Sequence, residues 1–155
     1  MARFKTSLEK MLAANIRQMN KFVEFAENEA LKSVQKDSDK VEEKERERIF
    51  DGKTFTGENI TPSYKPYTVM VKEQKGQPTD RVTLKDTGDF HRSIKFEVSK
   101  TITQLTATDD KTAKLEAKYA NILGLSESTD VFIITNIINR VNPKLFKKLL
   151  QPRYL

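Results

Sequence analysis

The sequence predicts an α+β fold in which a long N-terminal helix and C-terminal helices pack on a small, mainly antiparallel sheet. Three observations lead to this prediction. Apolar residues recur at three- and four-residue spacing towards both ends of the chain, which is typical of amphipathic helices. Residues 82–84, 94–98 and 102–108 alternate apolar and polar side chains, which is typical of strands. Glycines and prolines separate the two kinds of segment.

Residues 3 to 35 are expected to form one amphipathic helix, because no glycine or proline interrupts their helical spacing. At about 1.5 Å per residue this helix would extend for about 50 Å, more than the width of a small domain. Its free end could therefore bind a neighbouring subunit, and the alternative is a helix that only packs in the core. Residues 37–39 can cap a second helix over residues 41–50. We expect that helix to be exposed or at a subunit boundary, because it has few apolar residues.

The middle of the chain is expected to begin with a loop over residues 53–80. Within it, residues 69–73 could form a strand or a helix, and a helix ending at Gly76 is favoured. A strand at 82–84 then leads into a turn where Gly88 can take a positive φ. One helical turn follows, and its four-residue spacing points Phe90 and Ile94 to the same side. Strands 94–98 and 102–108 are expected to pair as an antiparallel hairpin.

The C-terminal third is expected to be helical. Thr112 can cap a helix that runs through Leu123 and stops at Gly124. A last helix begins after Ser126 and keeps helical spacing out to Leu145, although β-branched residues make a strand the competing prediction for 131–138. The Asn142-Pro143 pair should kink or restart it.

We expect one domain with three parts. These are a helical arm or hairpin over residues 1–50, an α+β core over 51–125 that contains the loop 53–80, and a C-terminal helix with a basic tail over 126–155. The chain has no cysteine, no apolar run long enough to span a membrane, and no signal-peptide core near its start. We therefore expect a soluble protein that does not bind membranes.

Residues capable of catalysis are few. His91 is the only histidine. Asp89, His91 and Ser93 lie close in sequence but do not match a catalytic triad, and Asp86, Asp89 and His91 do not match a metal-ligand spacing. The two aspartates are expected to cap the turn and the helix, and His91 to lie at the surface or an interface. We therefore expect no enzymatic activity, no cofactor and no metal.

The charge distribution points to an anionic partner. The net charge is +6, from 28 Lys and Arg against 22 Asp and Glu, and no acidic residue follows Asp130. A basic tail of this kind suits DNA or an acidic protein surface. The alternative is a solvated cluster that is favoured at a helix C-terminus by the helix dipole. The tail residues are Arg140, Lys144, Lys147, Lys148 and Arg153.

Two segments carry a family resemblance. Residues 84–94, LKDTGDFHRSI, resemble the L-x-D-T-G-x-(aromatic or Leu)-x-x-S-I signature of the virion-morphogenesis proteins of tailed bacteriophages, which are small tail-completion or head–tail connector proteins. Residues 118–124, KYANILG, are similar to a Y-A-x-I segment, ending in glycine, that often follows in that family. The positions that carry the resemblance are Asp86, Thr87, Gly88, Phe90, Ser93, Ile94, Tyr119 and Gly124.

The resemblance implies a structural virion protein at the head–tail junction or tail, made in the host bacterial cytoplasm. Such a protein would assemble into a homo-oligomeric ring of six or twelve copies and contact portal, adaptor or tail proteins, with non-specific contact to packaged DNA. A lysine-rich loop before the D-T-G motif would face the ring channel or a neighbour. The candidate contacts to a partner or DNA are Lys72, Lys75, Arg140, Lys144, Lys147, Lys148 and Arg153.

The alternative function is that of a small basic nucleic-acid-binding or regulatory protein. Only the positive charge and the basic tail support it, and the sequence contains no recognisable recognition-helix motif.

Overall fold

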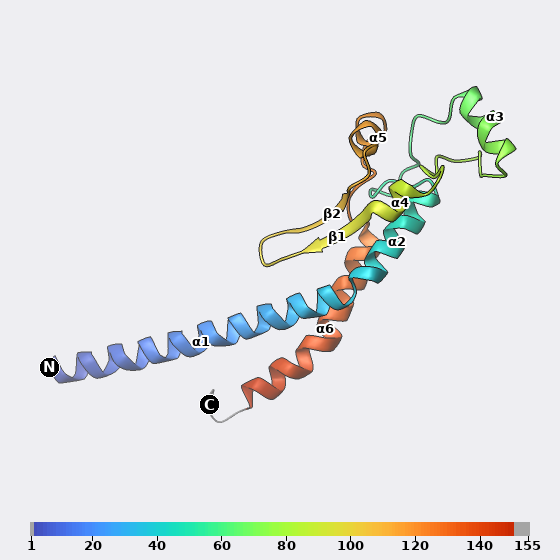
Figure 1. The fold of residues 1–155 in the computed structure, drawn as a ribbon. Coiled ribbons are helices and arrows are strands. Elements are labelled where there is room, and N and C mark those ends of the chain that lie inside the picture. The colour runs from blue at the N-terminus through green and yellow to red at the C-terminus, as the bar shows by residue number, and fades with distance from the viewer. Residues whose placement is uncertain (1, 151–155) are drawn as a thin grey trace. The chain divides into compact units, whose positions relative to one another are not determined.

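The computed structural model describes residues 2–150, with side chains from residue 8 onward (Figure 1). These residues form six helices and a two-stranded antiparallel sheet, which confirms the α+β class and the long N-terminal helix. In chain order the elements are α1 (Ala2–Lys36), α2 (Ser38–Phe50), α3 (Pro66–Gln74), α4 (Asp89–Ser93), β1 (Ile94–Val98), β2 (Thr103–Ala107), α5 (Thr112–Lys118) and α6 (Glu127–Leu149). None of the helices in the described part of the chain could cross a bilayer by length and apolarity.

The chain divides into two compact units. The helical unit comprises Met1–Gln35 and Thr135–Leu155, and the mixed unit comprises Lys36–Ile134. These boundaries differ from the predicted ones at residues 50 and 125, because α2 and the first turns of α6 belong to the mixed unit.

The core of the mixed unit forms around the predicted hairpin. β1 pairs with β2 in the register Ile94↔Ala107 to Val98↔Thr103, as the alternation predicted. Ile94, Phe96 and Leu105 are buried on one face. α2 packs on β1 (Figure 1). The helix that covers the sheet within this unit is therefore the short charged one.

One face of α2 is buried within the mixed unit, so the prediction of an exposed helix was wrong for that face, and the alternative of a subunit boundary stays a prediction. Val41, Glu45 and Ile49 are spaced four residues apart on one face, and all three are fully buried. Glu42 is also buried. Its carboxylate accepts a hydrogen bond from the backbone N–H of Phe96 at 3.1 Å, which compensates for the loss of contact with water. Glu42 thus occupies a core position by satisfying a backbone donor that the two-stranded sheet leaves unpaired.

Residues 82–84 do not form the predicted strand. The backbone N–H groups of Thr83 and Leu84 donate to the Tyr64 hydroxyl at 2.9 and 3.1 Å, and Leu84 has a φ of 49°. The hydroxyl of Tyr64, about twenty residues away, therefore accepts the backbone N–H groups that would otherwise pair with a neighbouring strand.

The helix predicted to run from Thr112 to Leu123 is shorter than expected. α5 ends at Lys118, and Tyr119 takes an extended conformation at its C-terminus. Gly124 is therefore not a helix stop. It allows a close approach instead, since a Cβ atom at this position would lie 2.5 Å from the Phe55 ring.

Other predictions agree with the structure or differ only in detail. Residues 69–73 lie in a helix, α3, and residues 131–138 lie in α6. α6 continues through Pro143 as one element, so it does not restart at Asn142-Pro143, and a kink there stays a prediction. Asp37 lies at the start of α2 as predicted, but its side chain makes no capping hydrogen bond there.

The helical unit pairs α1 with α6 in antiparallel orientation. Arg140 donates to the backbone carbonyl of Ser33 at 3.1 Å, and Lys144 forms an ion pair with Glu29. The ammonium of Lys148 lies 5.1 Å from the centre of the Phe25 ring. Each step of four residues forward along α6 is matched by a step of four residues backward along α1, as antiparallel helices require.

Candidate functional site

The D-T-G turn, residues 85–89, is held in place by the conformation of Gly88. This residue has a φ of 91° and lies at the N-cap of α4, so the predicted positive φ is confirmed. A side chain at this position would be strained, and its Cβ atom would lie 2.9 Å from the Arg92 guanidinium. Ser93 ends the helical turn by donating its hydroxyl hydrogen to the Phe90 carbonyl at 2.8 Å.

The two aspartates of the turn form surface ion pairs rather than helix caps. Asp86 accepts a hydrogen bond from the Lys75 ammonium at 2.5 Å, which lowers the pKa of that carboxyl and joins the turn to the loop after α3. The Thr87 hydroxyl and the Arg92 guanidinium both donate to Asp89 and lower its pKa. Among residues 2–150, no three metal-ligating side chains gather closely enough to hold an ion.

A pocket of about 350 Å³ opens beside this turn. α3, α5 and the D-T-G turn form its walls. Phe90 and Tyr119 are both buried and contribute apolar surface to it. Lysine and aspartate side chains, among them Lys111 and Asp109, add charge around the apolar lining. The apolar lining residues are Tyr64, Tyr67, Val71, Leu84, Phe90, Leu115 and Tyr119.

The pocket brings together the two segments that carry the family resemblance. The first segment contributes Asp86, Thr87, Gly88 and Phe90 to the pocket, and the second contributes Tyr119. Ser93, Ile94 and Gly124 do not line the pocket. Ile94 is fully buried in the hairpin core, and Gly124 packs against Phe55.

Lys72, expected from the sequence as a contact to a partner or DNA, is buried within the chain. Only 7% of its surface is exposed, and its ammonium lies 5.0 Å from the centre of the Tyr64 ring. It donates to the Lys85 carbonyl at 2.6 Å and to the Gln77 amide oxygen at 2.9 Å. Lys72 therefore holds α3 against the segment that leads into the turn, and it fixes one wall of the pocket.

His91 is buried, so the prediction of a surface or interface position was wrong. Its Nε2 atom lies 2.8 Å from the Thr83 carbonyl oxygen, and because a carbonyl can only accept, Nε2 donates. The rings of Phe50 and Phe90 meet the imidazole edge-on. Burial is the main cause that lowers the pKa of His91, and the nearby charges of Lys85 and Arg46 lower it further. The neutral imidazole therefore acts as a structural donor under the turn.

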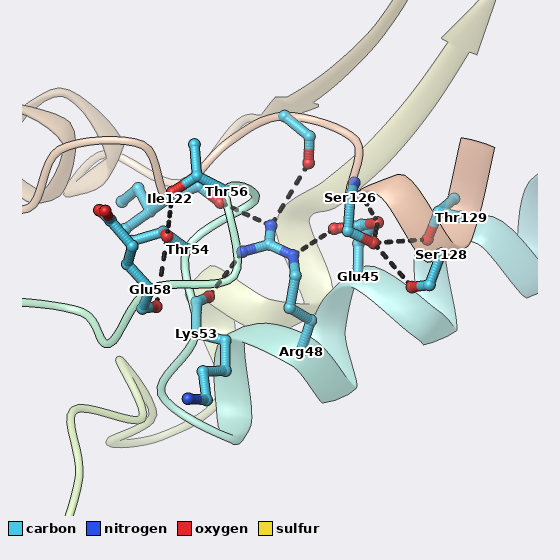
Figure 2. Close-up of polar contacts among 11 residues, drawn as sticks. Glu45, Arg48, Lys53, Thr54, Thr56, Glu58, Ile122, Ser126, Ser128 and Thr129 are labelled. Carbon is cyan, nitrogen blue, oxygen red and sulfur yellow. Dashed lines mark hydrogen bonds and ion pairs between the residues drawn. The ribbon is translucent and has the colours of Figure 1, made fainter. Parts of the chain in front are cut away.

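A buried network that sequence reasoning missed supports the second segment (Figure 2). The Glu45 carboxylate accepts hydrogen bonds from the backbone N–H and the hydroxyl of Ser126, at 3.0 and 2.8 Å. Arg48 donates to the same carboxylate at 2.5 Å, and to the carbonyls of Lys53 and Ile122 at 2.6 and 2.9 Å. α2 therefore fixes the chain that runs from Ile122 to the start of α6.

The Glu45 carboxyl stays ionised although it is buried, because these donors stabilise its negative charge. Burial is the largest single influence and by itself raises the pKa of the carboxyl. The hydrogen bonds from Thr129, Ser126 and Arg48 outweigh it and bring the pKa below the ordinary value of 4.5. The position next to the α6 N-terminus adds to this preference for a negative charge. In the sequence, the Glu45–Arg48 pair is one of several alternating charges and carries no distinguishing signal.

The basic tail residues are mostly engaged within the helical unit. Arg140, Lys144 and Lys148 contact Ser33, Glu29 and Phe25 of α1, as described above. The two lysines that reach Glu29, Lys144 and Lys32, lower the pKa of its carboxyl. Lys147 is exposed, Lys75 is exposed but paired with Asp86, and Arg153 lies outside the described residues.

No protein-family model, curated protein or solved structure matches this chain. The resemblance to phage virion proteins therefore depends on the residues of the two segments alone.

The geometry of the pocket suits binding. It presents aromatic and aliphatic surface surrounded by charged side chains, the composition of sites that take up an apolar group and orient it by polar contacts. The buried histidine of the mixed unit, His91, and its fully buried carboxylate, Glu45, both hold backbone groups in place.

Proposed function

We propose that this chain is a non-enzymatic structural virion protein of a tailed bacteriophage, a head–tail connector or tail-completion subunit that assembles into a ring between portal and tail. One observation carries the proposal: the two segments that resemble that family line the same pocket, although 23 residues, 95–117, separate them in the sequence. We infer that the two motifs act together, by forming a pocket that receives a side chain or other group of a partner.

Exposed apolar side chains of the mixed unit support an assembly role. Tyr67 lines the pocket and is 73% exposed, and Met70 on the same helix is also exposed. At the start of α6, Val131 and Ile134 are exposed as well. Apolar side chains that folding leaves uncovered in groups mark sites of protein–protein contact. A pocket on one copy and a different apolar surface on the next form a heterologous interface, the type that closes into rings.

A second candidate function is nucleic-acid binding, and the charge distribution favours it. The helical unit contains 11 Lys and Arg against four Asp and Glu, whereas the mixed unit contains 17 against 18. The positive charge of the whole chain therefore resides in the helical unit. In a connector, the same charge would meet the phosphates of passing DNA without reading sequence.

Light scattering and negative-stain imaging of the purified chain test the proposal. We expect a single ring-sized species that forms as concentration rises, without added DNA. A chain that remains monomeric at every concentration would contradict ring assembly. If that monomer also binds duplex DNA with an affinity that falls steeply with salt, the result supports the nucleic-acid function in place of the connector function.

A further inference from the structure

α1 presents a second apolar surface, which is separate from the pocket. Leu12, Ile16, Met19, Val23, Ala26 and Ala30 follow one another at alternating steps of four and three residues, and we name this set the α1 seam. Its four largest side chains, from Leu12 to Val23, are between 50% and 67% exposed. A repeat of this kind places all six residues along one line of a helix that supercoils with a partner helix.

α6 does not cover the seam. The α6 contacts reach Phe25, Glu29 and Ser33 of α1, and the first two lie beside the seam rather than on it. Near the end of α6, Leu149 lines a groove with Met19 and Val23, yet these two side chains remain 67% and 50% exposed. Over the described residues, the seam thus extends for about 27 Å of helix with its large side chains open.

The identities of the seam residues specify the geometry of a partner. In the heptad nomenclature, the a positions hold Ile16 and Val23, and the d positions hold Leu12 and Met19. In parallel coiled coils, β-branched residues at a, combined with residues at d that are not β-branched, favour two strands over higher assemblies. A second copy aligned in the same direction and register would set each a residue, and each d residue, against its own counterpart.

The charges of α1 favour a second copy over a lipid surface or a nucleic acid. Between residues 8 and 30 the helix contains three basic and four acidic residues, so this stretch does not attract polyanions. Lys10, Arg17 and Glu24 occupy b positions, which point away from a partner. At flanking positions, Asn15 (g) would face Asn20 (e) of the other copy, an uncharged pair that brings no like charges together.

We propose that α1 pairs with α1 of a second copy through the α1 seam, as a parallel, in-register, two-stranded coiled coil. This interface is distinct from the pocket and does not depend on the proposed ring function. It gives the chain an isologous contact in addition to the heterologous one.

Single-cysteine cross-linking tests the pairing, because the chain has no cysteine of its own. In a parallel in-register pair, residue 16 of one helix lies against residue 16 of the other, whereas residue 17 points outward. We expect Ile16→Cys to form a disulfide-linked dimer under mild oxidation and Arg17→Cys, one residue away, to remain largely monomeric on a non-reducing gel. Equal cross-linking of the two variants, or none at Ile16→Cys, would overturn the proposal.

A second pair of variants measures the association itself. Ile16→Asp should raise the dissociation constant of the pair by about a hundredfold or more, because it places two carboxylates in the seam, while Arg17→Asp should leave it nearly unchanged. Sedimentation equilibrium gives the constant, and circular dichroism checks that both variants keep their helix content. A wild-type chain that binds phosphatidylserine-containing vesicles as a monomer, and loses this binding in Ile16→Asp, would assign the seam to a bilayer instead.

The ring proposal and the α1 pairing can be tested independently of each other. Tyr67→Asp, which alters the pocket and not the seam, should leave the cross-linking of Ile16→Cys unchanged. A loss of cross-linking in the Tyr67→Asp background would contradict a self-contained α1 pair.

Discussion

The side chains beneath the D-T-G turn show how polar residues come to be buried here. His91, Lys72 and Tyr64 each place a polar atom on a backbone group or side chain of residues 83–85. This short segment lacks a partner strand, so three side chains satisfy it in place of a sheet ladder. The walls of the pocket depend on these bonds, since Leu84 and Lys85 line it.

The buried state of His91 makes stability depend on pH. Its pKa in the folded protein is lower than the ordinary value of 6.5, so below that pH the unfolded chain takes up the proton first. We expect the free energy of unfolding to fall as pH decreases from 6.5 towards the folded pKa, and to be insensitive to this group above about pH 7.5. Urea unfolding between about pH 5 and 8 measures the slope.

The His91→Gln variant is the matched control for this slope. A glutamine amide can donate to the Thr83 carbonyl but does not titrate. The pH dependence in this window should therefore be lost in the variant. An identical slope in wild type and His91→Gln would show that another group causes it.

At the level of single residues, the sequence correctly predicted conformations and burial that depend on neighbouring residues in the chain. The left-handed Gly88 and the shared burial of Phe90 and Ile94 follow from residues within one turn of each other. The burial of Lys72 and His91 depends on acceptors that only the folded chain brings within reach. No local pattern distinguishes such a lysine from an exposed one.

At the level of elements, α2 differs most from its sequence-based description. Its interleaved charges suggested a solvated helix, yet Val41, Glu45 and Ile49 form the stripe that packs in the core. The predicted capping residues and the interleaved charges located the helix correctly. They could not show that a glutamate would occupy a core position, because the partners of that glutamate lie some eighty residues further along the chain.

Glu45 therefore joins two elements, and its removal should weaken the mixed unit as a whole. Glu45→Ala leaves Arg48 without its carboxylate partner and the Ser126 N–H without an acceptor, so we expect a loss of about 3 kcal/mol in the free energy of unfolding. Chemical denaturation measures it. Glu43→Ala, an exposed position on the same helix, should change the free energy of unfolding by less than about 0.5 kcal/mol.

If both alanine variants lose the same small amount, the network does not hold α2 to the start of α6. Acidification provides an independent check, since a carboxyl whose folded pKa is lowered stabilises the protein above its unfolded pKa of 4.5. That contribution is lost as pH falls through the folded value.

The elements that sequence reasoning misplaced share one cause. Residues 82–84 have strand-like alternation, but the Tyr64 hydroxyl takes their donors. The helix from Thr112 stops at Lys118, before the apolar residues that suggested a longer one. In both segments tertiary contacts decided the outcome, whereas the hairpin and the long helices follow periodic patterns that extend over several turns or both strands.

On the scale of the whole molecule, the two units have different charge. The helical unit holds the positive charge of the chain, and the mixed unit is nearly balanced and contains the pocket. The sequence placed the excess of positive charge in the tail after Asp130, and the basic residues of that tail belong to the helical unit. The basic tail and the apolar pocket thus lie in different units of the chain.

Assembly through the pocket is tested most directly by sedimentation velocity of the wild-type chain beside Tyr67→Asp. Tyr67 is 73% exposed, so the substitution should not affect folding, while it places a charge on the wall of the pocket. Ile102→Asp is the matched control, because it makes the same kind of change at an exposed site outside the pocket. We predict that wild type and Ile102→Asp form the large species and that Tyr67→Asp does not. A Tyr67→Asp chain that assembles as readily as wild type would contradict a role for the pocket in assembly.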